Sequence, residues 1–296
     1  MSESACGRAS SFRLEKGSGW YDFVMLNHFF AVAGVTLAAM LVGAVILHAI
    51  PLLGSAGRRL GDAMCRAPGL DVSITYFTIA PLIVGPFVAG WIGFLGALAG
   101  QVTSVFLWQW THEALHPEGR RGPRIVKVMN AKVGRLRNHT ATWITAICTP
   151  IFWFVRLAEI FVYTPLPWLV GLPKYEHSQW VNVSRQKFEG LVGHDLIWCL
   201  YCDCMTGVWS LGTEMLRNVE SFWCPIRFRS DKKCVNCATD FPDIENGWVN
   251  ADGTMAEVAE TIERMYPNDQ PRAWFGHPVR ITVKGQPIEQ EPVMAK

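Results

Sequence analysis

The chain has 296 residues, of which half are hydrophobic and 18% are charged. Ordinary soluble domains contain about 25% charged residues, and the composition excludes a disordered chain, a collagen and a coiled coil. The charge also changes along the chain, because residues 1–170 hold 14 Lys and Arg against 8 Asp and Glu, whereas residues 171–296 hold 13 against 17. The two parts therefore need separate interpretation.

Two long stretches carry no charged side chain. Phe23 to Gly57 covers 35 residues and Val72 to Thr111 covers 40, whereas a helix needs only about 20 apolar residues to cross a bilayer. The first stretch follows a polar tail of 22 residues and is too long for a signal peptide. We predict an integral membrane protein whose first span runs from Val24 to Leu53.

The second stretch is too long for a single straight span. As one helix it would measure roughly 60 Å, about twice the hydrocarbon thickness of a bilayer. Pro81 and Pro86 interrupt its first half, and small residues at Gly90, Gly93, Gly96 and Gly100 would let helices approach closely. We predict two short crossings or a re-entrant hairpin.

Basic residues on both sides of this stretch support a double crossing. The loop before it, Gly54 to Asp71, contains three arginines, and the loop after it, residues 118–137, contains seven basic residues. Basic loops stay on the cytoplasmic side of a membrane. If both loops are inside, the chain between them must cross twice.

A third apolar region runs from Thr140 to Leu172. It contains Arg156 and Glu159, whose i, i+3 spacing predicts an ion pair on one helix face. Ionisable residues at membrane depth mark functional sites by default, but a structural pair is the interpretation that we favour. The prolines of this region leave open whether it crosses once or dips and returns.

These patterns give a division into three parts. Residues 1–22 form a polar tail, residues 23–172 an all-α membrane part with three to five membrane segments and the basic loop 118–137, and residues 173–296 a cysteine-rich, mixed α/β part that is soluble or lies on the membrane surface. In the last part the sequence predicts helices over Phe188–Phe222 and Thr254–Met265, and a strand over Val279–Lys284.

Six of the nine cysteines fall between residues 199 and 237. They include two Cys-x2-Cys pairs, Cys199 with Cys202 and Cys234 with Cys237, which could direct four thiolates to one tetrahedral zinc ion. The 31 residues between the pairs exceed the usual separation in zinc ribbons. Further candidate ligands are Cys204, Cys224 and His194. Disulfides, or an iron or redox-active thiol site, are the alternatives.

A second candidate metal site lies at the end of the long apolar stretch. His112-Glu113-Ala114-Leu115-His116 matches the motif of zinc metalloproteases, in which two imidazoles bind zinc and the glutamate activates water. Pro117 follows directly and should end the helix, and no third ligand stands in the expected downstream pattern. A helix end at the membrane interface is the favoured interpretation, with His112 and His116 as metal ligands and Glu113 as a catalytic base as the alternative.

We therefore expect an integral membrane protein in an accessory or assembly role, with zinc bound to its C-terminal part. Its expected partners are the lipid bilayer and other membrane subunits, and no nucleic acid. The basic loops favour a cytosolic C-terminal part. A membrane-embedded zinc hydrolase and a membrane redox protein using thiols or iron are the alternatives.

Overall fold

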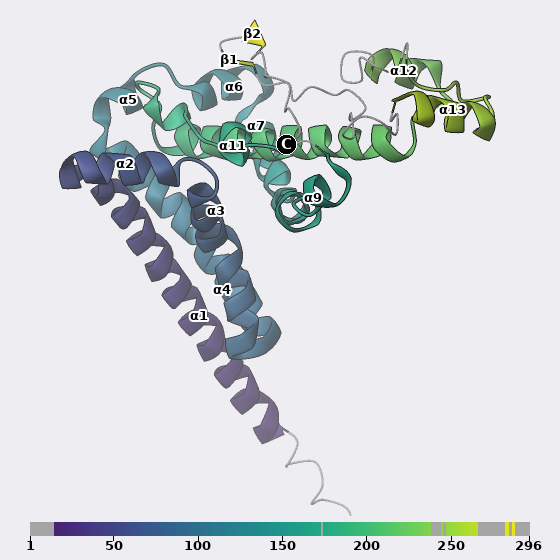
Figure 1. Cartoon of the computed structure of the whole chain (residues 1–296). Coiled ribbons are helices and arrows are strands. Elements are labelled where there is room, and N and C mark those ends of the chain that lie inside the picture. The colour runs from purple at the N-terminus through teal and green to yellow at the C-terminus, as the bar shows by residue number, and fades with distance from the viewer. Residues whose placement is uncertain are drawn as a thin grey trace, which may run out of the picture. The chain divides into compact units, whose positions relative to one another are not determined.

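A computed structural model describes residues 15–172, 174–237, 244, 247–265, 282–283 and 286–287 (Figure 1). Its internal contacts divide the chain into two compact units. The first unit comprises residues 1–128 and 184–200, and the second comprises residues 129–183 and 201–296. The boundary predicted from composition, after residue 172, falls inside the second unit.

The first unit is built from helices joined by short turns and loops. Its elements are α1 (Glu15–Ala49), η1 (Ile50–Leu53), α2 (Gly54–Met64), α3 (Gly69–Ile74), the π-helical turn η2 (Thr75–Ile79), α4 (Ala80–Leu115), α5 (Pro117–Arg121), most of α6 (Ile125–Val133), η4 (Arg185–Lys187) and the start of α11 (Gly193–Trp223). The helices α1 and α4 lie side by side (Figure 1).

The 40-residue apolar stretch forms a hairpin. Helical geometry breaks at Ala89 and at Gly90, where φ is 57°, a value that glycine adopts without steric cost. The chain then returns along itself: a Cβ on Gly85 would lie 2.5 Å from the carbonyl oxygen of Gly93, and the Gln101 side chain donates hydrogen bonds of 2.8 and 2.9 Å to the carbonyls of Phe77 and Thr78. The predicted reversal of the chain is confirmed.

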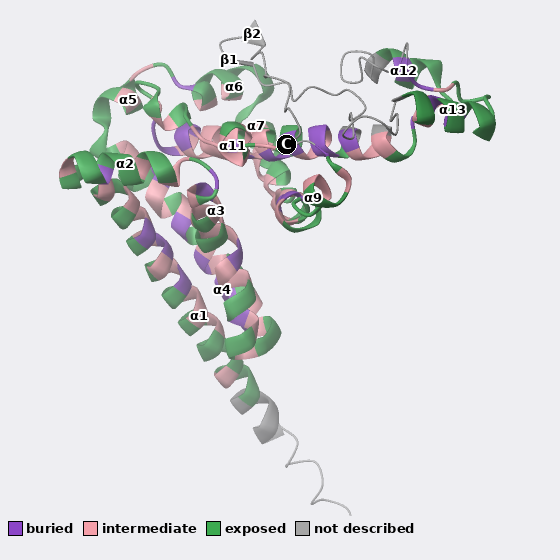
Figure 2. Cartoon of the chain, viewed as in Figure 1, coloured by how far each residue is buried: buried purple, intermediate pink, exposed green. Residues whose placement is uncertain are grey.

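Close backbone contacts set the register between α1 and the returning arm. A Cβ on Gly96 would lie 2.7 Å from the carbonyl oxygen of Phe29, and one on Gly100 would lie 2.5 Å from that of Ala33. The two helices therefore run parallel. In this register Gly90, where the chain reverses, lies beside the start of the apolar part of α1. Buried residues line this contact, while the outward faces are exposed (Figure 2).

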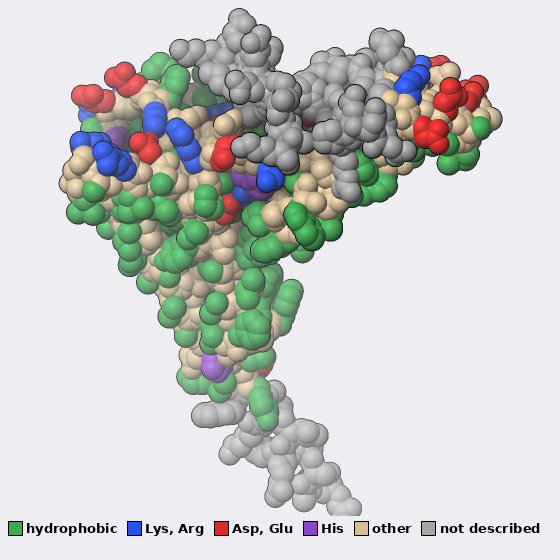
Figure 3. Space-filling view, in the orientation of Figure 1, with side chains coloured by type: hydrophobic (Ala, Val, Ile, Leu, Met, Phe, Trp, Pro, Cys, Tyr) green, Lys and Arg blue, Asp and Glu red, His purple; other side chains and the backbone are tan. Residues whose placement is uncertain are grey.

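Among the described residues, three helical stretches are long and apolar enough to cross a membrane: Tyr21–Met64, Gly69–Leu115 and Arg135–Val162. Little of each apolar window is buried inside the protein, and hydrophobic side chains cover the visible face of α1 and α4 (Figure 3). Such a surface is unfavourable in water and suits lipid. The prediction of a mostly helical chain with helices long and apolar enough to span a membrane is confirmed.

The second unit contains α7 (Arg135–Ala146), α8 (Thr149–Leu157), the π-helical turn η3 (Ala158–Val162), α9 (Leu166–Val170), α10 (His177–Trp180), the rest of α11, α12 (Asp231–Cys237) and α13 (Met255–Met265). The break between α7 and α8 precedes Pro150, the first-turn proline of α8. The helices predicted over 188–222 and 254–265 are confirmed, with ends shifted by a few residues.

The mixed α/β character predicted for the C-terminal part is not supported. Its described residues are mainly helical, and its strands are the two-residue pair β1 (Thr282–Val283) and β2 (Gln286–Pro287), which are antiparallel. The strand predicted over Val279–Lys284 is present only at Thr282 and Val283, and its other positions lie outside the described residues. A two-stranded ribbon of this length cannot form a sheet core.

The hairpin geometry predicts two complete crossings. Residues 72–89 and 91–111 would measure roughly 27 and 31 Å as helices, close to the hydrocarbon thickness of about 30 Å. Single cysteines at Val88, beside the reversal, and at Ser55, on α2, should therefore react with a membrane-impermeant maleimide from opposite sides of the membrane.

A cysteine at Ala97, which is fully buried, serves as the unreactive control, and the unmodified chain gives the background from native cysteines. Reaction of Val88→Cys from the same side as Ser55→Cys, or its protection from both sides, would indicate a re-entrant hairpin instead.

Candidate functional site

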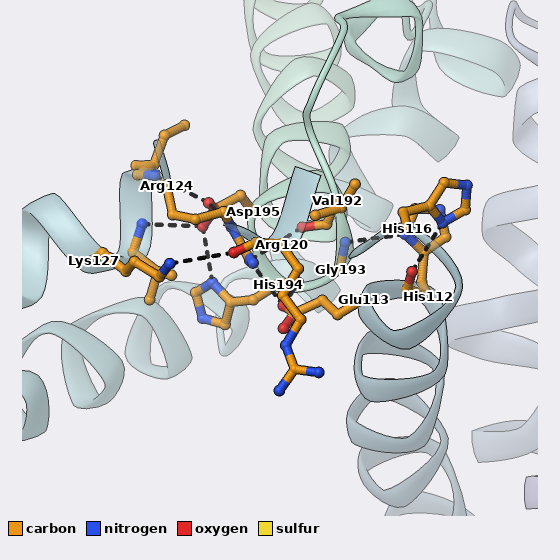
Figure 4. Close-up of polar contacts among 12 residues, drawn as sticks. His112, Glu113, His116, Arg120, Arg124, Lys127, Val192, Gly193, His194 and Asp195 are labelled. Atoms are coloured by element: carbon orange, nitrogen blue, oxygen red, sulfur yellow. Dashed lines mark hydrogen bonds and ion pairs between the residues drawn. The ribbon is translucent and has the colours of Figure 1, made fainter. Parts of the chain in front are cut away.

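The end of α4, the start of α6 and the start of α11 meet at Arg124 in the first unit (Figure 4). Arg124 Nη2 donates to Glu113 Oε1 at 2.8 Å, and Arg124 Nε donates to Asp195 Oδ2 at 2.8 Å. The guanidinium also donates to the carbonyl oxygen of Val192 at 3.3 Å. One arginine thus joins three segments that are far apart in the sequence.

This cluster is withdrawn from solvent. The exposed fractions of the side chains are 4% for Arg124, 3% for Asp195 and 21% for Glu113. Buried charges are costly unless they are paired and hydrogen-bonded. Every member of the cluster has such partners, and this dense pairing identifies the junction as the best-defined polar site of the first unit.

Asp195 also completes the start of α6. Its carboxylate accepts hydrogen bonds from the backbone N–H groups of Ile125 at 3.0 Å and Val126 at 3.1 Å. These first N–H groups of a helix have no partner within the helix, and a carboxylate at this end also interacts favourably with the helix dipole. Asp195 therefore links two helices in addition to pairing with Arg124.

The protonation of the cluster follows from these contacts. Burial alone would raise the pKa of Asp195, but hydrogen bonds from His194, Arg124 and Val126 and the charge of Arg124 together hold it below its ordinary value. Burial would lower the pKa of Arg124, but Glu113 and Asp195 raise it above its ordinary value. Both groups are ionised at neutral pH.

His112 and Glu113 accept hydrogen bonds from backbone N–H groups at the start of α11, as Asp195 does at the start of α6. The N–H of Gly193 donates to His112 Nδ1 at 3.2 Å, and the N–H of His194 donates to Glu113 Oε1 at 3.2 Å. Gly193 has a φ of 52°, and a side chain there would collide with the Glu113 carboxylate. The close approach of the end of α4 to the start of α11 explains why position 193 is a glycine and why the His112-Glu113 dipeptide faces it.

The histidines of the metalloprotease-like motif stack rather than converge. The rings of His112 and His116 are 4.2 Å apart between centroids with an interplanar angle of 21°, and His116 Nδ1 donates to the carbonyl of His112 at 2.9 Å. His112 Nδ1 accepts the hydrogen bond from Gly193, so the proton of the neutral ring sits on Nε2. With Nδ1 occupied in this way, Nε2 is the atom that a zinc ion would need. The ring centroid of His48 lies 5.8 Å from that of His112.

The candidate cysteine ligands are spread over α11, α12 and the position just after α11. Cys199, Cys202 and Cys204 lie on α11 and Cys234 on α12, with Cys224 just after α11; Cys204 and Cys234 are buried, and Cys202 and Cys224 are exposed. Cys237 ends α12, and its side chain lies outside the described part. Within that part, no group of three or more His, Cys, Asp or Glu side chains could hold a metal ion, and no disulfide occurs.

The remaining candidate ligand, His194, belongs to the junction. Its Nδ1 lies 3.4 Å from Asp195 Oδ1, and its ring is 6.2 Å from that of Trp198 between centroids. The sequence groups His194 with the cysteines because it precedes the first pair on the same predicted helix. The structure instead joins His194 and its neighbour Asp195 to Glu113, at the end of α4, and to Arg124.

A second buried ionic cluster lies in the second unit. Arg156 donates to Glu159 at 2.7 Å, which confirms the predicted i, i+3 pair, and Arg156 Nη1 lies 2.9 Å from His177 Nδ1. Glu159 sits on the π-helical turn η3 and faces Gly212 of α11, where an added Cβ would lie 3.2 Å from its Oε1. The favoured structural interpretation of the pair fits this packing.

Comparisons with known proteins add no relative: no family model, no curated protein and no solved structure matches this chain. The interpretation of the site therefore rests on its own geometry.

The buried junction predicts a large stability difference between two neighbouring arginines. Arg124→Gln leaves the buried carboxylate of Asp195 and the partly buried one of Glu113 without their cation, and breaking a buried ion pair in this way costs about 3–5 kcal/mol. Arg121 is exposed at the end of α5, and Arg121→Gln should change stability by less than about 0.5 kcal/mol. Thermal unfolding in detergent, followed by tryptophan fluorescence, measures both.

Equal stabilities of the two variants would show that the cluster does not hold the junction together.

Proposed function

We propose that this chain is an integral membrane protein with an accessory or assembly role, in which the helical hairpin is the anchor and the long helix α11 offers a contact surface. One observation carries this proposal: His112 and Glu113 of the metalloprotease-like motif connect chain segments of the first unit through hydrogen bonds. Glu113 is held by Arg124 and the start of α11, and His112 by Gly193. These contacts favour a structural junction over a hydrolytic centre.

Two further features support an assembly role. The helix α11 is 31 residues long, much longer than the helices around it in the second unit, and it carries exposed Trp209, Leu216 and Trp223. Exposed aromatic and aliphatic residues on a long helix suit contact with another protein or with the membrane interface. Other membrane subunits are thus the proposed protein partners.

This role predicts that the chain resides in a hetero-complex. Chemical cross-linking in intact membranes, followed by mild detergent extraction and light scattering, should give a particle heavier than the 33.1 kDa chain, with at least one other membrane protein in constant ratio. Cross-linking before extraction prevents loss of weakly bound subunits. A chain that is recovered only as a monomer or as copies of itself contradicts the assembly role.

We further propose that the cysteine-rich part binds one structural zinc ion. The proposal is supported by the two Cys-x2-Cys pairs, Cys199 with Cys202 and Cys234 with Cys237, and by the helix α12, which carries the second pair within seven residues. Bound zinc requires a rearrangement of α11 and α12 or a contribution from Cys237, because the described side chains form no such site. Metal binding of this kind couples to folding.

Elemental analysis of the purified chain tests this proposal. The expected result is close to one zinc per chain, lost in Cys234→Ser, Cys237→Ser and retained in His112→Ala, His116→Ala. Iron in place of zinc would support the redox alternative, and zinc lost in the histidine variant would support the hydrolase alternative. A chain without metal, whose thiols react only after reduction, would indicate disulfides.

A further inference from the structure

Six exposed basic side chains gather at one end of the hairpin, and together they are termed the basic rim. The parallel register of α1 with the returning arm brings the ends of both to the same end of the unit, followed by α2 and α5 respectively. Basic side chains are visible over this end in Figure 3. The basic rim comprises Arg58, Arg59, Arg66, Arg120, Arg121 and Lys127.

Aromatic rings mark the depth of the basic rim relative to the membrane. The ring of His48, near the end of α1, lies 6.0 Å from that of Trp108 and 5.8 Å from that of His112, near the end of α4. Trp and His side chains favour the layer between hydrocarbon and water. The basic rim begins within ten residues of these rings along both chain segments and therefore lies at the level of the lipid headgroups.

The helix α2 has the character of a helix that lies in the interface. Gly57 packs against the carbonyl of Ile50, so that α2 is held close to the end of α1. Leu53 and Leu60 are exposed, as are Arg58 and Arg59. A short helix with leucines on one side and arginines on the other suits a position in the membrane plane, with the leucines in the acyl region and the arginines among headgroups.

Few acidic groups offset this positive charge. Within α2, α5 and their flanking residues the exposed carboxylates are Asp62 and Glu118, and Asp62 already pairs with Lys187 at 3.1 Å. Asp195 and Glu113 are committed to the buried Arg124. Among the described residues of the first unit, exposed basic groups therefore outnumber exposed acidic groups at this end, even with Glu189 counted, which is exposed beside Gly190 where that residue packs against α5.

We propose that the basic rim binds the headgroups of anionic phospholipids. The partner is identified by charge complementarity at headgroup depth, and each basic residue near an anionic surface strengthens such binding by about fivefold. The proposal goes beyond the assembly role, since it concerns the lipids around the first unit and requires membrane insertion but no protein partner.

Lipid retention by the purified full chain tests the proposal. The chain is reconstituted with equal amounts of phosphatidylglycerol and phosphatidylcholine, re-extracted in mild detergent, and analysed by mass spectrometry for bound lipid. Phosphatidylglycerol should be enriched at low salt, and the enrichment should fall severalfold at about 0.5 M NaCl, because salt screens exposed charges.

Two double variants with the same charge loss make the test specific. Arg58→Gln, Arg59→Gln should lower the enrichment by about an order of magnitude, whereas Arg229→Gln, Lys232→Gln, at two exposed positions outside the three apolar stretches, should leave it within twofold. Asp62→Asn should raise it. Equal losses in the two double variants, or an enrichment that does not respond to salt, would overturn the proposal. The measurement uses the isolated chain, so its failure is separate from that of the assembly role.

Discussion

The burial of one guanidinium, that of Arg124, is the constraint on which the first unit depends. It has to lie between Glu113 and Asp195 at the point where the hairpin leaves its apolar environment. Two carboxylates would exceed the charge of one arginine, but the N-termini of α6 and α11 supply three backbone N–H donors to these carboxylates and the positive ends of two helix dipoles. The cluster is therefore close to balanced, and it fixes where three chain segments meet.

The same constraint gives the residues of the metalloprotease-like motif a structural role. A helix that ends at a membrane interface and meets the start of another helix needs hydrogen-bond acceptors for that helix's first N–H groups. His112 and Glu113 provide them. In this structure His112 Nδ1 accepts from a backbone N–H group, the Glu113 carboxylate accepts from another and from Arg124, and the rings of His112 and His116 stack.

Local patterns predicted the features that depend on local physics. Charge-free length and small residues predicted the hairpin, and the spacing of Arg156 and Glu159 predicted their pair. The pairing of Arg124 with Asp195 joins residues 71 positions apart, and within the sequence Arg124 was one of seven similar basic residues. The failed α/β prediction rested on a six-residue pattern, which is too short to distinguish a strand that belongs to a sheet from an isolated ribbon.

The short helix α5 separates two functions of one basic segment. It starts at Pro117, which cannot continue α4, and its single turn leaves Arg120 and Arg121 exposed. Arg124 follows beyond the turn and points inward to the two carboxylates. Arg124 is therefore buried, whereas Arg120 and Arg121, only three or four positions away, are exposed. A buried cation needs fixed hydrogen-bond acceptors, but an exposed one needs only anionic groups nearby. The segment can then hold the junction and carry the basic rim at once.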